Sequence, residues 1–179
     1  MSLHPAGARA LDEVMLCPAL SELGFGDEVG AFQVASPGTA VAVANRAYYQ
    51  PFYLPTTVQV LKLYIANGAT IDGNIDMGIY STAGTRLVSQ GSVAHAGVDV
   101  LQPLDIADTV LARGTYYLSF AASSATATFT RIVLNTQICR AAGLLQQNTA
   151  FPLPATATFA TYGSSFVPLC GLSLRTLVA

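Results

Sequence analysis

The chain has 179 residues, of which 52% are hydrophobic and only 10% charged, and its net charge is −2. An average soluble domain carries about 25% charged residues, so the surface of this protein is unusually neutral. The length fits one β-sandwich or barrel with a substantial core and is too short for two ordinary domains. Few charges leave little electrostatic resistance to association, which favours an oligomer.

The distribution of charge and apolar residues argues against several classes of protein. The eight cations are spread singly, without the basic cluster that binding of DNA or RNA requires. No apolar run reaches the roughly 20 residues of a transmembrane helix, and the N-terminus lacks the features of a signal peptide. The three cysteines, Cys17, Cys139 and Cys170, have no CxxC spacing, so we expect free thiols in a reducing cytoplasm.

The first thirty residues differ from the rest of the chain. A short helix is expected before Pro18, and several glycines follow it closely. We interpret residues 1–30 as an extended or partly helical N-terminal arm and residues 31–179 as the folded domain. The apolar side of the arm, which would anchor it to a partner, consists of Leu11, Val14 and Met15.

Short β-prone segments separated by turn residues make up the chain from residue 31 onward. The clearest alternation, in residues 74–80, predicts a strand with one core-facing side. A turn at residues 81–84 needs Gly84 at positive φ and leads to a partner strand, which predicts a hairpin. The core-facing residues of the first strand are Ile75, Met77 and Ile79.

Further strands are expected on both sides of this hairpin. They cover residues 46–54, residues 58–66 with Leu61, Leu63 and Ile65 on one face, residues 115–121, 128–134, 155–162 and 166–177. Residues 138–147 fit either a helical turn or a long loop. About eight short strands without a long amphipathic helix predict an all-β fold, an antiparallel β-sandwich of jelly-roll type.

Residues suited to catalysis or metal binding are scarce. The pairs Asp72 with Asp76 and Asp105 with Asp108 lie beside turn residues, where solvated loops are the simpler interpretation. His95 would have to act almost alone as a base, and none of the common catalytic motifs is present. The segment 72–76 lacks the further ligands of an EF-hand, so a structural calcium is the lesser alternative. We expect a non-enzymatic protein without a catalytic site, metal or cofactor.

Tyrosines are the candidates for contact with a partner. An exposed tyrosine can stack on a sugar ring and is also favoured at protein interfaces, while the absence of Trp argues against sugar. In the alternative interpretation, every second residue of 48–53 lines the core of the sandwich and the others cover its rim. The candidate interface or glycan-contact residues are Tyr48, Tyr49, Tyr53, Tyr64, Tyr117 and Tyr162.

Three segments resemble a β-sandwich module of tailed-bacteriophage virion proteins. They are Ala44–Phe52, residues 74–80 with the turn and strand that follow, and Gly114–Ser119, so the resemblance covers about residues 40–135. The family's turn before the paired tyrosines has Pro-Gly, where this chain has Arg113-Gly114. The strand and turn patterns also occur in carbohydrate-binding jelly rolls.

The resemblance implies a structural component of the virion that is assembled in the host cytoplasm. Its role would be that of a capsid decoration or cement protein, a head fibre, or a tail or baseplate adaptor. Its partners would be other virion proteins, such as capsid or tail subunits, and copies of itself, with a trimer favoured. The alternative is a tail or fibre module that binds a receptor or glycan.

Overall fold

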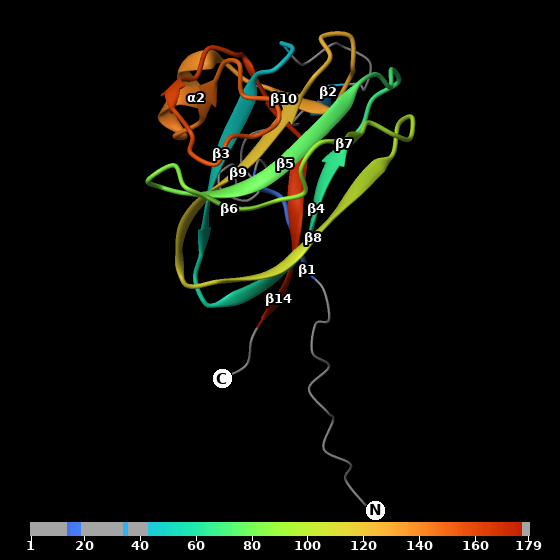
Figure 1. The fold of residues 1–179 in the computed structure, drawn as a ribbon. Helices are drawn as coiled ribbons and strands as arrows, with labels where there is room; N and C mark the ends of the chain where they lie inside the picture. The colour runs from blue at the N-terminus through green and yellow to red at the C-terminus, as the bar shows by residue number, and fades with distance from the viewer. Residues whose placement is uncertain (1–13, 19–33, 36–42, 177–179) are drawn as a thin grey trace, which may run out of the picture.

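The computed structural model describes residues 14–18, 34–35 and 43–176, and this part of the chain folds into antiparallel sheets (Figure 1). It also contains the short helix α2 (Thr136–Ala141), whose N-cap Asn135 accepts a hydrogen bond from the backbone N–H of Gln137. The predicted all-β fold is confirmed.

Two sheets form the body of the molecule. The four-stranded sheet has the order β1 (Val14–Leu16), β14 (Cys170–Thr176), β4 (Val58–Ala66) and β8 (Leu101–Leu111). The seven-stranded sheet has the order β12 (Ala160–Thr161), β11 (Leu145–Gln147), β3 (Ala47–Leu54), β9 (Gly114–Ala122), β5 (Asn74–Ser81) and β6 (Arg86–Ser89), and β7 (Val93–Ala94) also pairs with β5. A small third sheet contains β13 (Phe166–Pro168), β10 (Arg131–Val133) and β2 (Val34–Ala35).

The main core lies between the two larger sheets, so the fold is a sandwich. Alternate residues of the longer strands, β3, β4, β5, β8 and β9, point into one continuous apolar cluster, as strand geometry requires. The seven-stranded sheet contributes the predicted core face of β5, namely Ile75, Met77 and Ile79, which are fully buried. The four-stranded sheet contributes Val60, Leu63, Ile65, Leu104, Ile106 and Leu172.

The predicted hairpin is also present. β5 pairs antiparallel with β6, and Gly84 in the turn has φ +86°. Its N–H donates to the carbonyl of Ser81 at 3.0 Å, which closes the turn. Glycine adopts this left-handed conformation without the steric cost that a Cβ atom imposes.

Several details of the predicted elements are wrong. The strand expected over residues 155–162 is confined to β12 at Ala160–Thr161, and no strand was predicted where β8 lies. Val14–Leu16 form a strand that pairs with β14, where we expected the end of a helix, because β14 offers backbone partners that the local sequence does not reveal. Leu11 lies outside the described residues. In β4, a bulge between Val60 and Lys62 changes the alternation, so that Val60 rather than Leu61 joins the core.

The outer face of the seven-stranded sheet is covered by the chain itself. Outward-facing Tyr49 and Tyr80 are fully buried beneath Leu153, Phe159 and their neighbours in the segment between β11 and β12. In Figure 1, α2 and the orange segments that directly follow it lie on the β3 side of the molecule. This second core makes β3 and β5 buried on both faces.

Candidate interaction surface

Three of the six candidate tyrosines lie in the interior, which corrects their prediction as surface contacts. Tyr48 is fully buried in the main core, where its ring centroid lies 6.0 Å from that of Tyr162 and 5.5 Å from that of Phe166. Tyr162 is equally buried, and its hydroxyl donates to the carbonyl of Phe166 at 2.5 Å. Burial in low dielectric raises the pKa of both phenols.

Tyr49 is buried on the other side of β3. Its ring lies 5.3 Å from that of Tyr80 and 5.0 Å from that of Phe159, both edge to face. Its hydroxyl donates to Gln147, and burial raises its pKa to about 12. Every second residue of 48–53 was predicted to line a single core. The structure has a second core on the other side of β3, to which the segment between β11 and β12 contributes.

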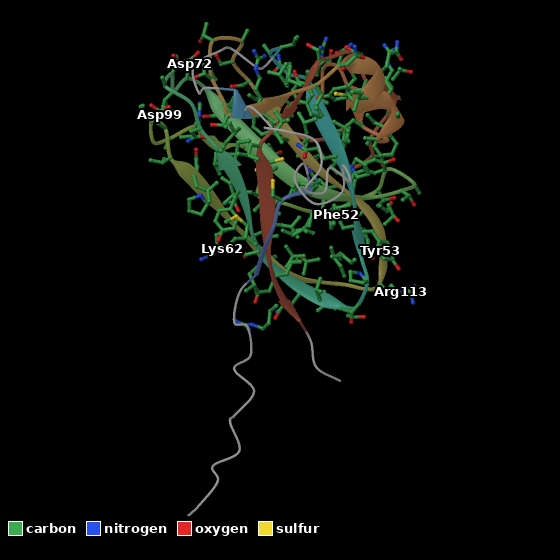
Figure 2. All side chains as sticks on the ribbon, turned by 180° about the vertical axis from the view of Figure 1, so that it is seen from behind. Phe52, Tyr53, Lys62, Asp72, Asp99 and Arg113 are labelled. Carbon is green, nitrogen blue, oxygen red and sulfur yellow. The ribbon has the colours of Figure 1, made fainter. Side chains whose placement is uncertain are left out.

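The other three candidates reach the surface in different places. Tyr53 is 40% exposed, and its hydroxyl accepts a hydrogen bond from Nε of Arg113 at 2.7 Å. Figure 2 shows both side chains near one end of the molecule, whereas Asp72 and Asp99 lie near the other. Tyr117 packs against Phe159 on the seven-stranded sheet. The half-buried Tyr64 lies on the four-stranded sheet, so these tyrosines do not form one aromatic cleft.

The outer face of the four-stranded sheet, here called the open face, carries several exposed side chains. Core residues of β4 and β8 point inward, so the alternate residues point out. In cross-strand register, Tyr64 lies opposite Pro103 and Lys62 lies opposite Asp105. Figure 2 shows the Lys62 side chain pointing away from the ribbon. On the open face, Gly171 and Ser173 of β14 lie opposite Tyr64 and Lys62 and are buried. The residues of this face that are at least partly exposed are Met15, Gln59, Lys62, Tyr64, Leu101, Pro103, Asp105, Asp108, Val110 and Arg175.

The open face is both apolar and charged. Leu101 is 46% exposed, Val110 58% and Met15 51%, values that are high for large apolar side chains. Its positive charges, Lys62 and Arg175, lie on β4 and β14, while its negative charges lie on β8. Met15, one of the predicted arm contacts, therefore belongs to a sheet surface and not to a helical one.

A second cluster of polar residues lies where the loop before β5 meets the loops after β7 and after β9. The carboxylate of Asp72 accepts hydrogen bonds from the hydroxyls of Ser124 and Thr126, and these bonds lower its pKa. His95 is only 4% exposed, and its ring stacks on Phe129 with a centroid distance of 4.5 Å. Its Nδ1 accepts from the backbone N–H of Asp72 at 3.3 Å.

This arrangement gives His95 a structural role. Because Nδ1 accepts a hydrogen bond, the neutral ring carries its proton on Nε2, which is buried without a hydrogen-bond partner in the described part of the chain. Burial lowers the pKa of the imidazole. The carboxylate of Asp72 bonds to hydroxyls instead of to the imidazole, so the two groups do not form the aligned pair of a general base and its orienting acid.

Cys139 and Cys170 are buried, and burial raises the pKa of both thiols, which keeps them protonated. Within residues 14–18, 34–35 and 43–176, no group of three or more His, Cys, Asp or Glu side chains is placed to hold a metal ion. Helices of sufficient length and hydropathy to cross a membrane are also absent from these residues.

Comparison with known proteins gives no match to a family model, to a curated protein or to a solved structure. The function of this chain is therefore inferred from its own geometry and chemistry.

Proposed function

We propose that this chain is a non-enzymatic structural protein of a virus particle, a capsid decoration or cement protein that binds and stabilises neighbouring capsid subunits. The observation that carries this proposal is the open face, a sheet surface on which the large apolar side chains Met15, Leu101 and Val110 are about half exposed. Such a surface suits contact with other protein surfaces better than it suits a solitary soluble domain.

The strand order supports a jelly-roll fold, and with it the resemblance to phage virion modules. Eight strands form two opposed sets, in the orders β1-β14-β4-β8 and β3-β9-β5-β6. When these eight strands are renumbered 1 to 8 along the chain, the two orders are 1-8-3-6 and 2-7-4-5. Two nested Greek keys produce these orders, and viral capsid domains use that architecture. Because one fold serves many functions, the strand order supports the fold, and the surface must support the function.

The proposal predicts where the protein resides in cells that produce it. In a density gradient of the lysate, the chain should migrate with particles of megadalton mass and remain with them after washing in moderate salt. Cryo-electron microscopy of these particles should then show regularly repeated copies on the capsid. Recovery of the chain only in the small-protein fraction would contradict the proposal, and copies found only on the tail would move it to the adaptor or fibre class.

A receptor- or glycan-binding module is the second candidate, and the exposed pair of Tyr53 and Arg113 favours it. A tyrosine ring held by a guanidinium could stack on a sugar while the arginine donates to its hydroxyls. A glycan-array experiment with the full chain tests this. Selective binding that Tyr53→Ala abolishes, without a change in thermal stability, would favour the glycan-binding candidate.

A further inference from the structure

We propose that Asn67 is a deamidation site that the folded protein protects and that, once modified, prevents the chain from regaining its fold. This inference is independent of the proposed function, because it follows from the packing of one side chain. Asn67 is followed by Gly68, and the two form the one Asn-Gly pair in the sequence. Glycine after asparagine favours the reaction, because a residue without Cβ leaves its backbone nitrogen accessible and its backbone free to rotate.

The reaction consumes only water, and its atoms balance. The backbone nitrogen of Gly68 loses its proton and forms a bond to Cγ of Asn67, while the bond from Cγ to Nδ2 breaks and ammonia leaves. The product is a cyclic succinimide, which then takes up one water molecule. Hydrolysis of its new bond gives aspartate, and hydrolysis of the original peptide bond gives isoaspartate, which adds a methylene group to the main chain.

The native backbone holds the reacting groups in place. The N–H of Gly68 donates to the carbonyl of Thr128 at 2.8 Å, so attack by this nitrogen would break a backbone hydrogen bond. Asn67 forms an antiparallel bridge with Phe129, which requires an extended backbone, whereas ring closure requires the nitrogen to turn back towards Cγ. Asn67 is also only 2% exposed, which limits the access of water.

The amide group of Asn67 lies among three oxygen atoms of the segment from β7 to β8. Its Nδ2 lies 2.6 Å from the carbonyl oxygen of Ala96, 3.0 Å from that of Gly97 and 3.0 Å from Oε1 of Gln102. The orientation of Gln102 is fixed as well, since its Oε1 accepts from the N–H of Ala96 and its Nε2 donates to the carbonyl of Ala94. All three oxygens are therefore acceptors, and only the NH₂ group of Asn67 can face them.

Deamidation replaces this donor by an acceptor. Aspartate at position 67 would place a carboxylate oxygen against the same three acceptors in a buried position, and an uncompensated buried charge is strongly destabilising. Gln102 could donate to this carboxylate only by rotating its amide and losing its bonds to Ala94 and Ala96. Isoaspartate would in addition lengthen the main chain between the bonds from Asn67 to Val100 and from Gly68 to Thr128.

The fold and the reaction therefore oppose each other. The folded chain suppresses the reaction, and a chain that stays unfolded acquires a group that the native structure does not accommodate. Each unfolding event of sufficient duration is thus made irreversible at this one residue.

Peptide mass spectrometry of the full-length chain tests the protection of the site. The protein is incubated at pH 8 and 37 °C, both in buffer and in urea that unfolds it, and fragmentation assigns each mass increase to one residue. Asn67 should deamidate about a hundredfold or more faster in urea, because buried structure opens only rarely. Isomerisation of the neighbouring Asp72-Gly73 pair leaves the mass unchanged and is not counted.

The other asparagines of the chain are internal controls. None of them precedes a glycine, so in urea each should react more slowly than Asn67. They are Asn45, Asn74, Asn135 and Asn148.

A pair of variants tests the effect of the product without the reaction. Asn67→Asp should melt at a clearly lower temperature than the wild type or fail to fold, as measured by circular dichroism. Asn74→Asp makes the same chemical change at an exposed position of the same region and should melt close to the wild type.

A second pair of variants tests whether the β7–β8 loop protects the amide. Gly97 and Gly91 both have positive φ, but a Cβ at Gly97 would clash with Cγ2 of Val100, whereas one at Gly91 meets nothing within 4 Å. Because Gly97 also provides an acceptor for Asn67, Gly97→Ala should deamidate several times faster than Gly91→Ala in buffer.

Several outcomes would overturn the inference. They are equal rates at Asn67 in the folded and unfolded chain, faster deamidation of another asparagine in urea, Asn67→Asp that melts like the wild type, or equal rates in the two glycine variants. The proposed function is tested separately by the particle gradient, and none of these outcomes bears on it.

Discussion

The carboxylate of Asp76 accepts a hydrogen bond from the backbone N–H of Leu153, 77 positions later in the chain, at 2.9 Å. Its other oxygen accepts from the hydroxyl of Ser89 at 2.8 Å, and the side chain is fully buried. Arg86 donates to the carbonyl of Leu153 and lies close enough to act on the carboxylate. These bonds hold the covering segment against the outer face of the seven-stranded sheet.

Replacement of Asp76 by alanine should destabilise the protein by about 2 kcal/mol or more, because the buried N–H of Leu153 loses its acceptor. Replacement by asparagine should retain most of the stability, since its amide can accept from Leu153 and donate to Ser89. Urea unfolding of the two variants at pH 7 measures the difference. Equal losses in both variants would contradict this account.

The pH dependence of the same comparison has a defined sign. Burial raises the pKa of Asp76 in the folded protein, so the folded state favours the protonated acid. Relative to Asp76→Asn, the wild type should therefore lose stability as the pH rises from about 4 through the raised pKa. The stability difference between the two proteins, measured by urea unfolding from pH 3 to 7, should show this trend. A difference that is constant across the range would be inconsistent with the prediction.

His95 should produce the opposite trend near neutrality. Burial lowers its pKa, so its contribution to stability is present above about pH 6.5 and is lost as the pH falls through the lowered folded-state value. Protonation also turns Nδ1 from an acceptor into a donor, which breaks the bond from the N–H of Asp72. Compared with His95→Phe, which can keep the stacking on Phe129, the wild type should lose stability on acidification. Thermal melts at pH 5 to 8 provide the measurement, and parallel melting curves for the two proteins would exclude this role.

The burial of four tyrosines can be tested by their ionisation. Tyr48, Tyr49, Tyr80 and Tyr162 are fully buried, and burial raises the pKa of each, that of Tyr49 to about 12. The chain has eight tyrosines. At pH 11 the folded protein should therefore show at most about half of the tyrosinate absorbance at 295 nm that the denatured protein shows. A larger fraction, with unchanged circular dichroism, would place some of these rings at the surface.

Two glycines allow backbone strain to be separated from close packing. Gly84 and Gly91 both have positive φ, but a Cβ at Gly84 would lie 2.9 Å from the carbonyl oxygen of Ala157, whereas one at Gly91 meets nothing within 4 Å. Gly91→Ala should cost about 1–2 kcal/mol from the left-handed conformation alone. Gly84→Ala should cost clearly more, as measured by urea unfolding. Equal costs would mean that the covering segment yields to the added methyl group.

The sequence by itself determined the features that depend on near neighbours. The alternation around Ile75, Met77 and Ile79 predicted a core-facing strand, and the turn residues before Gly84 predicted the hairpin, because the pleat and the turn are set within a few residues. The all-β class followed from many such segments without a helical pattern. Low charge also indicated a surface suited to association.

Only the tertiary structure decided which surfaces remain exposed. Tyr49 and Tyr80 look like outward residues of their strands, and they are buried because a distant segment with Leu153 and Phe159 covers them. Val14–Leu16 became a strand because β14 supplied partners for its backbone. Lys62 and Asp105, 43 positions apart in the chain, became neighbours through the pairing of β4 and β8. Local periodicity specifies which residues alternate, but it carries no information on what a distant part of the chain places against either face.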